Sequence, residues 1–66
     1  MVQTDIVTQR AGLRQLTLDQ FWRAHGILGA SEEHMLSGDH ATALRCLDDL
    51  NEEVKRLRRS LKALED

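Results

Sequence analysis

The stretch that decides the fold is residues 43–64, which read ALRCLDDLNEEVKRLRRSLKAL. Apolar residues recur here at alternating intervals of four and three, which is the spacing of a heptad repeat. Because that spacing keeps the side chains on one side of a helix, it predicts a long helix over residues 40–65 with a continuous apolar seam. The members of this seam are Ala43, Leu47, Leu50, Val54, Leu57, Leu61 and Leu64.

The segment before this helix, SGDH at residues 37–40, predicts a tight turn. Gly38 suits the left-handed backbone that closes a helix C-terminus. Asp39 can accept a hydrogen bond from a backbone N–H in the first turn of the next helix. A helix that ends at this turn would therefore lie antiparallel to the one that follows it.

A first helix is predicted over residues 18–37, since Thr17 and Gln20 fit a capping box at its start. Its apolar positions keep helical phase through the glycines, which favours one helix over two; a kink near Gly29 is the alternative. These positions are Leu18, Phe21, Trp22, Leu28, Met35 and Leu36, with His25 in the same stripe.

Residues 1–16 are expected to form a flexible arm or a short helix broken at Gly12. The predicted fold class is all-α, with residues 17–66 forming an antiparallel helical hairpin. A chain of 66 residues buries only ~60% of its unfolded surface and needs additional stabilisation. We therefore expect the hairpin to complete a four-helix bundle by dimerisation or by docking on a partner, with parallel and antiparallel self-pairing both open.

Charge and composition exclude several function classes. The formal net charge of −2 gives no overall attraction to nucleic acid or anionic lipid. Cys46 is the single cysteine and cannot form an internal disulfide. The first ten residues lack the basic and apolar regions of a secretory signal, and no apolar run reaches the ~18 residues that span a bilayer. These features predict a soluble, cytoplasmic protein without membrane contact.

The octapeptide AHGILGAS at residues 24–31 resembles the phosphorylation box of histidine-containing phosphotransfer (HPt) domains, roughly AHxLKGAS. In this resemblance His25 matches the phospho-accepting histidine, and Gly29 matches the small residue that lets a receiver domain approach. Leu28 stands where the family has a lysine, and the segment that completes a four-helix bundle in one polypeptide is missing. The resemblance implies an alternative function in a phosphorelay through His25.

The orientation of the first helix distinguishes this alternative from a structural role for His25. If His25 belongs to the core, the stripe that contains it faces inward. If His25 is a phosphoryl acceptor, the opposite face is buried instead, with Ala24, Ile27 and Ala30 or Ser31 turned inward.

Metal and nucleic-acid sites have weaker support. His34, His40 and Cys46 lack the spacing of a zinc site, so neither a metal nor a cofactor is expected. A basic run in the second helix leaves nucleic-acid binding through its basic face as an alternative. Acidic residues on both sides of the run favour a solvated helix face. The run comprises Lys55, Arg56, Arg58, Arg59 and Lys62.

Together these patterns favour a small non-catalytic protein–protein interaction module that acts as a regulator, adaptor or inhibitor. Its expected partner is a second copy, a larger protein, or both. Aromatic anchors and seam leucines should dominate the contact, with Arg58 and Arg59 at its rim, so Leu57→Asp should abolish association. The expected contact residues are Phe21, Trp22, Leu50, Val54, Leu57, Arg58, Leu61 and Leu64.

Overall fold

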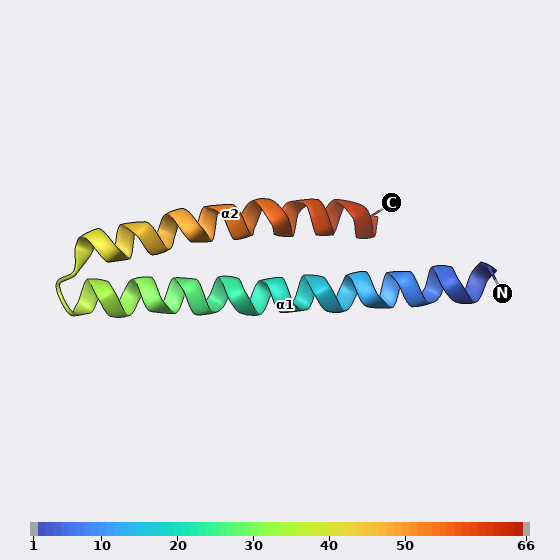
Figure 1. The fold of residues 1–66 in the computed structure, drawn as a ribbon, viewed down its shortest axis with the longest axis horizontal. Helices are drawn as coiled ribbons and strands as arrows, with labels where there is room; N and C mark the ends of the chain where they lie inside the picture. Colours follow the sequence, from blue (N-terminus) through green and yellow to red (C-terminus); the bar gives the residue numbers. More distant parts are fainter. Residues whose placement is uncertain (1, 66) are drawn as a thin grey trace.

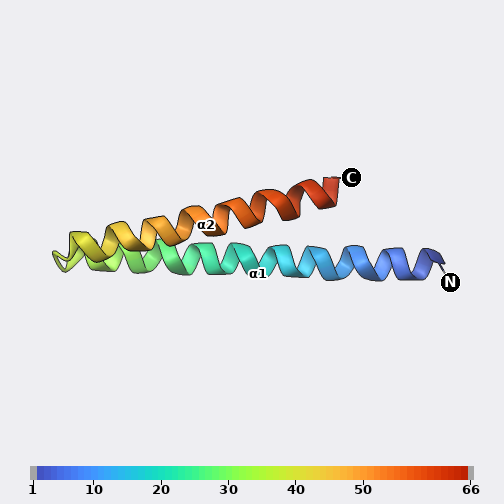
Figure 2. The same ribbon diagram turned by 45° about the horizontal axis from the view of Figure 1, so that its top comes forward.

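The computed structural model describes the backbone of residues 2–65 and the side chains of residues 9–65. Two helices, α1 (Val2–Leu36) and α2 (His40–Glu65), lie side by side and antiparallel in a rod of 56 × 14 × 11 Å (Figure 1). The helices separate gradually toward the C-terminus of α2 in Figure 2. The predicted all-α helical hairpin is confirmed.

Helix α1 begins earlier than the sequence predicts. It is continuous from Val2, so the segment before Leu18 is neither an arm nor a separate helix, and Gly29 does not interrupt it. Thr17 does not cap an N-terminus, because its hydroxyl donates a hydrogen bond to the Leu13 carbonyl within the helix (2.8 Å). A glycine inside a helix costs only ~1 kcal/mol, and without proline nothing stops the helix before the turn.

The turn has the structure that its residues predict. Gly38 has a φ of 86°, and its N–H donates to the Met35 carbonyl (3.0 Å) while the Asp39 N–H donates to the His34 carbonyl (2.9 Å). This pair of bonds is a Schellman motif. Asp39 then caps α2 by accepting a hydrogen bond from the Thr42 N–H (3.2 Å). The Thr42 side chain first, and its backbone second, hold the pKa of Asp39 below its ordinary value.

The two helices meet along a strip that we call the inner seam. Its residues are buried or half-buried and follow a heptad spacing on both helices. On α1 they are Leu13, Thr17, Gln20, Ala24, Ile27, Ser31 and His34. On α2 they are Ala43, Cys46, Leu50, Glu53, Leu57, Ser60 and Leu64.

This inner seam differs from the predicted apolar seam of α2 at every second member. Cys46, Glu53 and Ser60 face α1. The residues that follow them by one position, Leu47, Val54 and Leu61, are exposed. Both sets keep the four-and-three spacing with Ala43, Leu50, Leu57 and Leu64, so spacing alone does not choose between them.

Leu57 is the one large apolar side chain of the inner seam that is fully buried among the described residues, and Leu13, Ile27, Leu50 and Leu64 are half-buried. Among the described residues, the buried hydrophobic ones are Ala24, Ala43 and Leu57, and the buried polar ones are Thr17, Ser31, Glu53 and Ser60. Two hydroxyls join the helices: Ser31 donates to the Ala43 carbonyl (2.9 Å), and Ser60 donates to Oε1 of Gln20 (2.8 Å). Small side chains and hydrogen bonds therefore hold much of this seam together.

Candidate interaction surface

The large apolar side chains lie beside the inner seam, on a surface that we call the open apolar face. Its members are Leu18, Phe21, Leu28 and Met35 of α1, and Leu44, Leu47, Val54 and Leu61 of α2. Each follows an inner-seam residue by one position, which rotates the side chain by about 100°. Because α1 and α2 are antiparallel, this rotation turns the side chains of both helices toward the same side of the hairpin.

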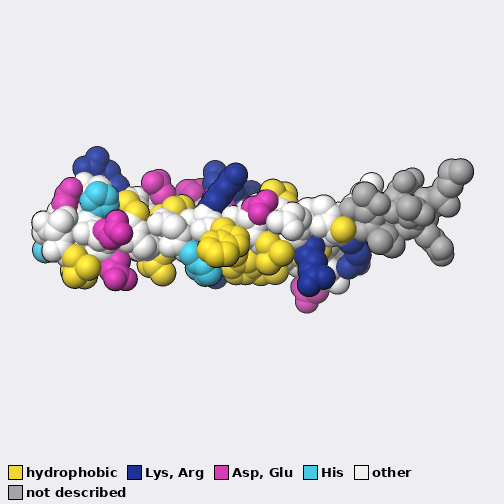
Figure 3. All heavy atoms as spheres, turned by 90° about the horizontal axis from the view of Figure 1, so that it is seen from below, with side chains coloured by type: hydrophobic (Ala, Val, Ile, Leu, Met, Phe, Trp, Pro, Cys, Tyr) yellow, Lys and Arg dark blue, Asp and Glu magenta, His cyan; other side chains and the backbone are white. Residues whose placement is uncertain are grey.

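All eight side chains are exposed, from 36% for Val54 to 65% for Leu44. Figure 3 shows the hairpin from the side of α1. Hydrophobic side chains gather over the middle of the hairpin and along the lower edge of this view. Exposed large apolar side chains that gather on one side of a protein often mark an interaction site. The open apolar face is therefore the strongest candidate for a functional surface.

An aromatic hollow borders this face in the middle of α1. It has a volume of about 240 Å³ and is lined by Leu18, Phe21, Trp22 and His25. Trp22 is 74% exposed, and its ring meets the His25 ring edge-on, with centroids 6.2 Å apart and planes at 77°. Exposed aromatic residues beside an apolar surface are typical anchors of protein interfaces.

The structure separates the predicted contact residues into two groups. Phe21, Trp22, Val54, Arg58 and Leu61 are exposed, so they are free to meet another molecule. The other three, Leu50, Leu57 and Leu64, lie on the inner seam and are half-buried or buried against α1.

The contact prediction also omits Leu18, Leu28, Met35, Leu44 and Leu47. The signal that identifies them is the heptad spacing of small residues on α1, at Thr17, Ala24 and Ser31. This spacing marks the side on which two helices approach closely. Large residues one position later then belong to a different face.

His25 is exposed, while Ala24 and Ser31 are buried and Ile27 and Ala30 are half-buried. This is the orientation expected for α1 if His25 is accessible rather than part of the core. A Cβ added at Gly29 would meet nothing within 4 Å, so packing within the hairpin does not require that glycine.

The basic residues of α2 do not form one continuous strip. Lys55 pairs with Glu52 (3.2 Å), and Arg56 pairs with Glu53 (3.0 Å). Arg58, Arg59 and Lys62 line a hollow of about 540 Å³ together with Leu61 and Glu65, toward the C-terminal end of the helix.

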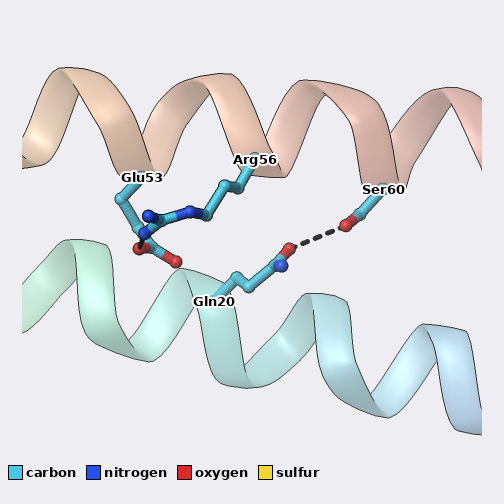
Figure 4. Close-up of polar contacts among 4 residues, drawn as sticks. All are labelled: Gln20, Glu53, Arg56 and Ser60. Carbon is cyan, nitrogen blue, oxygen red and sulfur yellow. Dashed lines mark hydrogen bonds and ion pairs between the residues drawn. The ribbon is translucent and has the colours of Figure 1, made fainter.

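Glu53 is a carboxylate within the inner seam, and its side chain is only 5% exposed. Figure 4 shows it pointing from α2 into the space between the helices, with Arg56 reaching back to it. Its Oε2 accepts a hydrogen bond from Arg56 Nη1 (3.0 Å), while Oε1 is buried without a hydrogen-bond partner. Glu53 thus places a carboxylate at a heptad position that is usually apolar, and the half-exposed Arg56 is its ion-pair partner.

The fold and the open apolar face define an all-α helical hairpin with an uncovered side. Among the described residues, no three His, Cys, Asp or Glu side chains gather as a metal site requires. The described parts of α1 and α2 include no segment with the length and apolarity to cross a membrane. Comparisons with models of protein families, with curated proteins and with solved structures find no match for this chain.

Proposed function

We propose that this chain is a non-catalytic protein–protein interaction module that acts by placing its open apolar face against another protein chain. The observation that carries the proposal is the inverted distribution of its side chains. Apart from Leu57, the fully buried residues of the inner seam are small or polar, whereas eight large apolar side chains lie exposed beside it. The hairpin is thus one half of a core whose other half belongs to a partner.

The size of the open apolar face supports this proposal. Covering the exposed part of a large apolar side chain contributes about 1 kcal/mol, so its eight members contribute on the order of 8 kcal/mol. That amount is comparable to the whole stability of a small domain. The inner seam, with Leu57 as its one large buried hydrophobic side chain among the described residues, leaves a two-helix chain marginally stable by itself.

Site-specific photo-crosslinking in cells that produce the protein tests the proposal. A benzophenone analogue of phenylalanine replaces Phe21 on the open apolar face. In the matched control it replaces Arg23, which is also exposed but precedes an inner-seam residue and so faces the opposite side. The proposal predicts a protein adduct from position 21 and little from position 23. No adduct, or equal yields at both positions, would overturn it.

A second candidate function is phosphoryl transfer through His25. It is supported by the exposure of His25 and the inward orientation of Ala24 and Ser31, the arrangement that the HPt resemblance requires. In this reaction the phosphoryl group would pass from the aspartyl phosphate of a receiver domain to a ring nitrogen of His25. Incubation with a phosphorylated receiver domain should then give an acid-labile label that is lost in His25→Gln and retained in His40→Gln. An unlabelled wild-type chain would eliminate this candidate.

A further inference from the structure

Two hydrogen bonds between α1 and α2 show which residues of the two helices lie level. Ser31 is joined to Ala43, and Gln20 is joined to Ser60. Midway between these bonds lie His25 on α1 and Asn51 on α2, and both are exposed. Each follows an inner-seam residue by one position, so both lie at the centre of the open apolar face.

The large apolar residues are arranged symmetrically about this centre. On α1, Phe21 lies four residues before His25 and Leu28 lies three residues after it. On α2, Leu47 lies four residues before Asn51 and Val54 lies three residues after it. A second hairpin turned end over end about this centre therefore places its Leu28 over Phe21 and its Val54 over Leu47.

We infer that the partner covering the open apolar face is a second copy of this chain, packed head to tail. This inference rests on the proposed interaction function and names its partner. The two-fold axis passes through the level of His25 and Asn51, so α1 lies against α1 of the second copy and α2 against its α2. Asn51 of one chain faces Asn51 of the other. A side-chain amide can be both hydrogen-bond donor and acceptor, so this pair can fix the register of the two chains.

The distribution of charge along the rod favours head-to-tail packing. Residues 27–50, next to the turn, carry five acidic residues and one arginine. Residues 9–26 and 51–65, in the other half, carry eight basic and four acidic residues. Head-to-tail packing brings the acidic half of each copy to the basic half of the other, whereas packing with both turns at one end brings like charges together.

Two flanking contacts follow from the same axis. Asp48 and Lys55 lie on the outer edge of α2, three residues before and four after Asn51, so each comes level with the other in the second copy. Trp22 and Gly29 have the corresponding positions on α1, so the exposed indole lies over the glycine of the second copy. This contact would use the open space around Gly29, where a Cβ meets nothing within 4 Å of its own chain.

Cysteine crosslinking tests this geometry in the 66-residue chain, with Cys46→Ala to remove the native thiol. Asn51→Cys alone should give a covalent dimer on oxidation or with a short bis-maleimide, and so should His25→Cys alone. Glu52→Cys, exposed on the other side of α2, is the matched control and should give none. If neither single variant crosslinks but a mixture of Asn51→Cys and His25→Cys does, both turns lie at one end and head-to-tail packing is wrong.

Charge reversal tests the same arrangement without a crosslink. Asp48→Lys should raise the dissociation constant of the dimer roughly tenfold. It places a lysine at position 48 of each copy level with Lys55 of the other, so like charges meet at two places in the contact. Adding Lys55→Asp should restore association, as measured by sedimentation equilibrium. A double variant as weak as the single one would overturn the inference.

The photo-crosslink at position 21 separates this inference from the proposed function. An adduct of twice the chain mass supports both. An adduct with a different protein, from a chain that sediments as a monomer, retains the proposed function and overturns self-association. Absence of any adduct overturns both.

Discussion

Apart from Leu57, the fully buried residues of the inner seam are alanine, serine, threonine and one glutamate, whereas the neighbouring open apolar face consists of exposed leucine, phenylalanine, methionine and valine. The two surfaces share the same heptad spacing and are offset by one residue. The inner seam is held partly by hydrogen bonds from Ser31 and Ser60. The open apolar face has hydrophobic area and no described residue that covers it. Most of the hydrophobic free energy still available to this chain therefore lies on the open apolar face and not in the contact between the helices.

The largest effect should separate the two surfaces at neighbouring positions of α2. Leu57 is 6% exposed on the inner seam and Val54 is 36% exposed on the open apolar face. Leu57→Asp should destabilise the hairpin itself by on the order of 4 kcal/mol, because it places a charge in an apolar site. Val54→Asp should prevent association and leave a hairpin that keeps its helices only in a solvent that favours the compact state.

Circular dichroism and sedimentation in trimethylamine N-oxide, which favours the compact state, distinguish these outcomes. The expected Val54→Asp variant is a helical monomer, and the expected Leu57→Asp variant has lost helix. If instead Leu57→Asp remained helical and only dissociated, Leu57 would belong to the contact with the partner.

The buried carboxylate of Glu53 gives a sharper test of the inner seam. Glu53→Leu should stabilise the chain by about 1–3 kcal/mol, since it replaces a desolvated charge with an apolar side chain at a heptad position. Arg56→Ala should destabilise it by about 1–3 kcal/mol, because Glu53 is then left without its partner. Urea unfolding measures both changes. Glu52→Gln, which breaks only the exposed pair with Lys55, should change stability by less than about 0.5 kcal/mol. Equal effects of Arg56→Ala and Glu52→Gln would mean that Glu53 is solvated.

The Ser31 hydroxyl should have a smaller effect. Ser31→Ala removes the bond to the Ala43 carbonyl and should cost about 1 kcal/mol. Ser37→Ala removes a bond of similar length to the His34 carbonyl (3.0 Å) on an exposed side chain and should cost little. Thermal unfolding of the two variants, compared with the wild type, checks this ranking. A reversed order would place the close contact between the helices elsewhere.

The smallest effect concerns the cap at Asp39. Hydrogen bonds from Thr42 lower the pKa of Asp39 in the folded chain. Its contribution to stability is therefore complete above the pKa of an unfolded aspartate, about 3.9, and is lost as the pH falls through the lower folded value. The stability difference between the wild type and Asp39→Ala should narrow below about pH 4. The difference between Asp39→Asn and Asp39→Ala, followed in the same titration, should stay constant.

Much of the fold can be predicted from a few residues. Gly38 and Asp39 specify the turn, and the four-and-three spacing specifies α2 with its observed bounds. The start of α1 could not be predicted from Thr17. A threonine can cap the N-terminus of a helix, or it can lie inside a helix and donate a hydrogen bond to the carbonyl four residues earlier, as Thr17 does to Leu13.

The candidate surface was predictable only in part, for a geometric reason. Leu47 and Cys46 differ by one position, and both continue the spacing set by Ala43 and Leu50. Hydrophobicity favours the leucine as the inner residue. Whether Cys46 or Leu47 faces inward depends on α1. The small side chains of Ala24 and Ser31 bring the two helices close together, so the larger side chains lie on the adjacent face.

The most direct test of whether self-association completes the core is the helix content of the unmodified chain on dilution, measured by circular dichroism together with sedimentation equilibrium. If the open apolar face completes the core by self-association, the chain should be a helical dimer at high concentration, and helix and dimer should be lost together. A monomer that remained fully helical at all concentrations would show instead that the inner seam is sufficient to hold the hairpin and that the open apolar face does not complete the core.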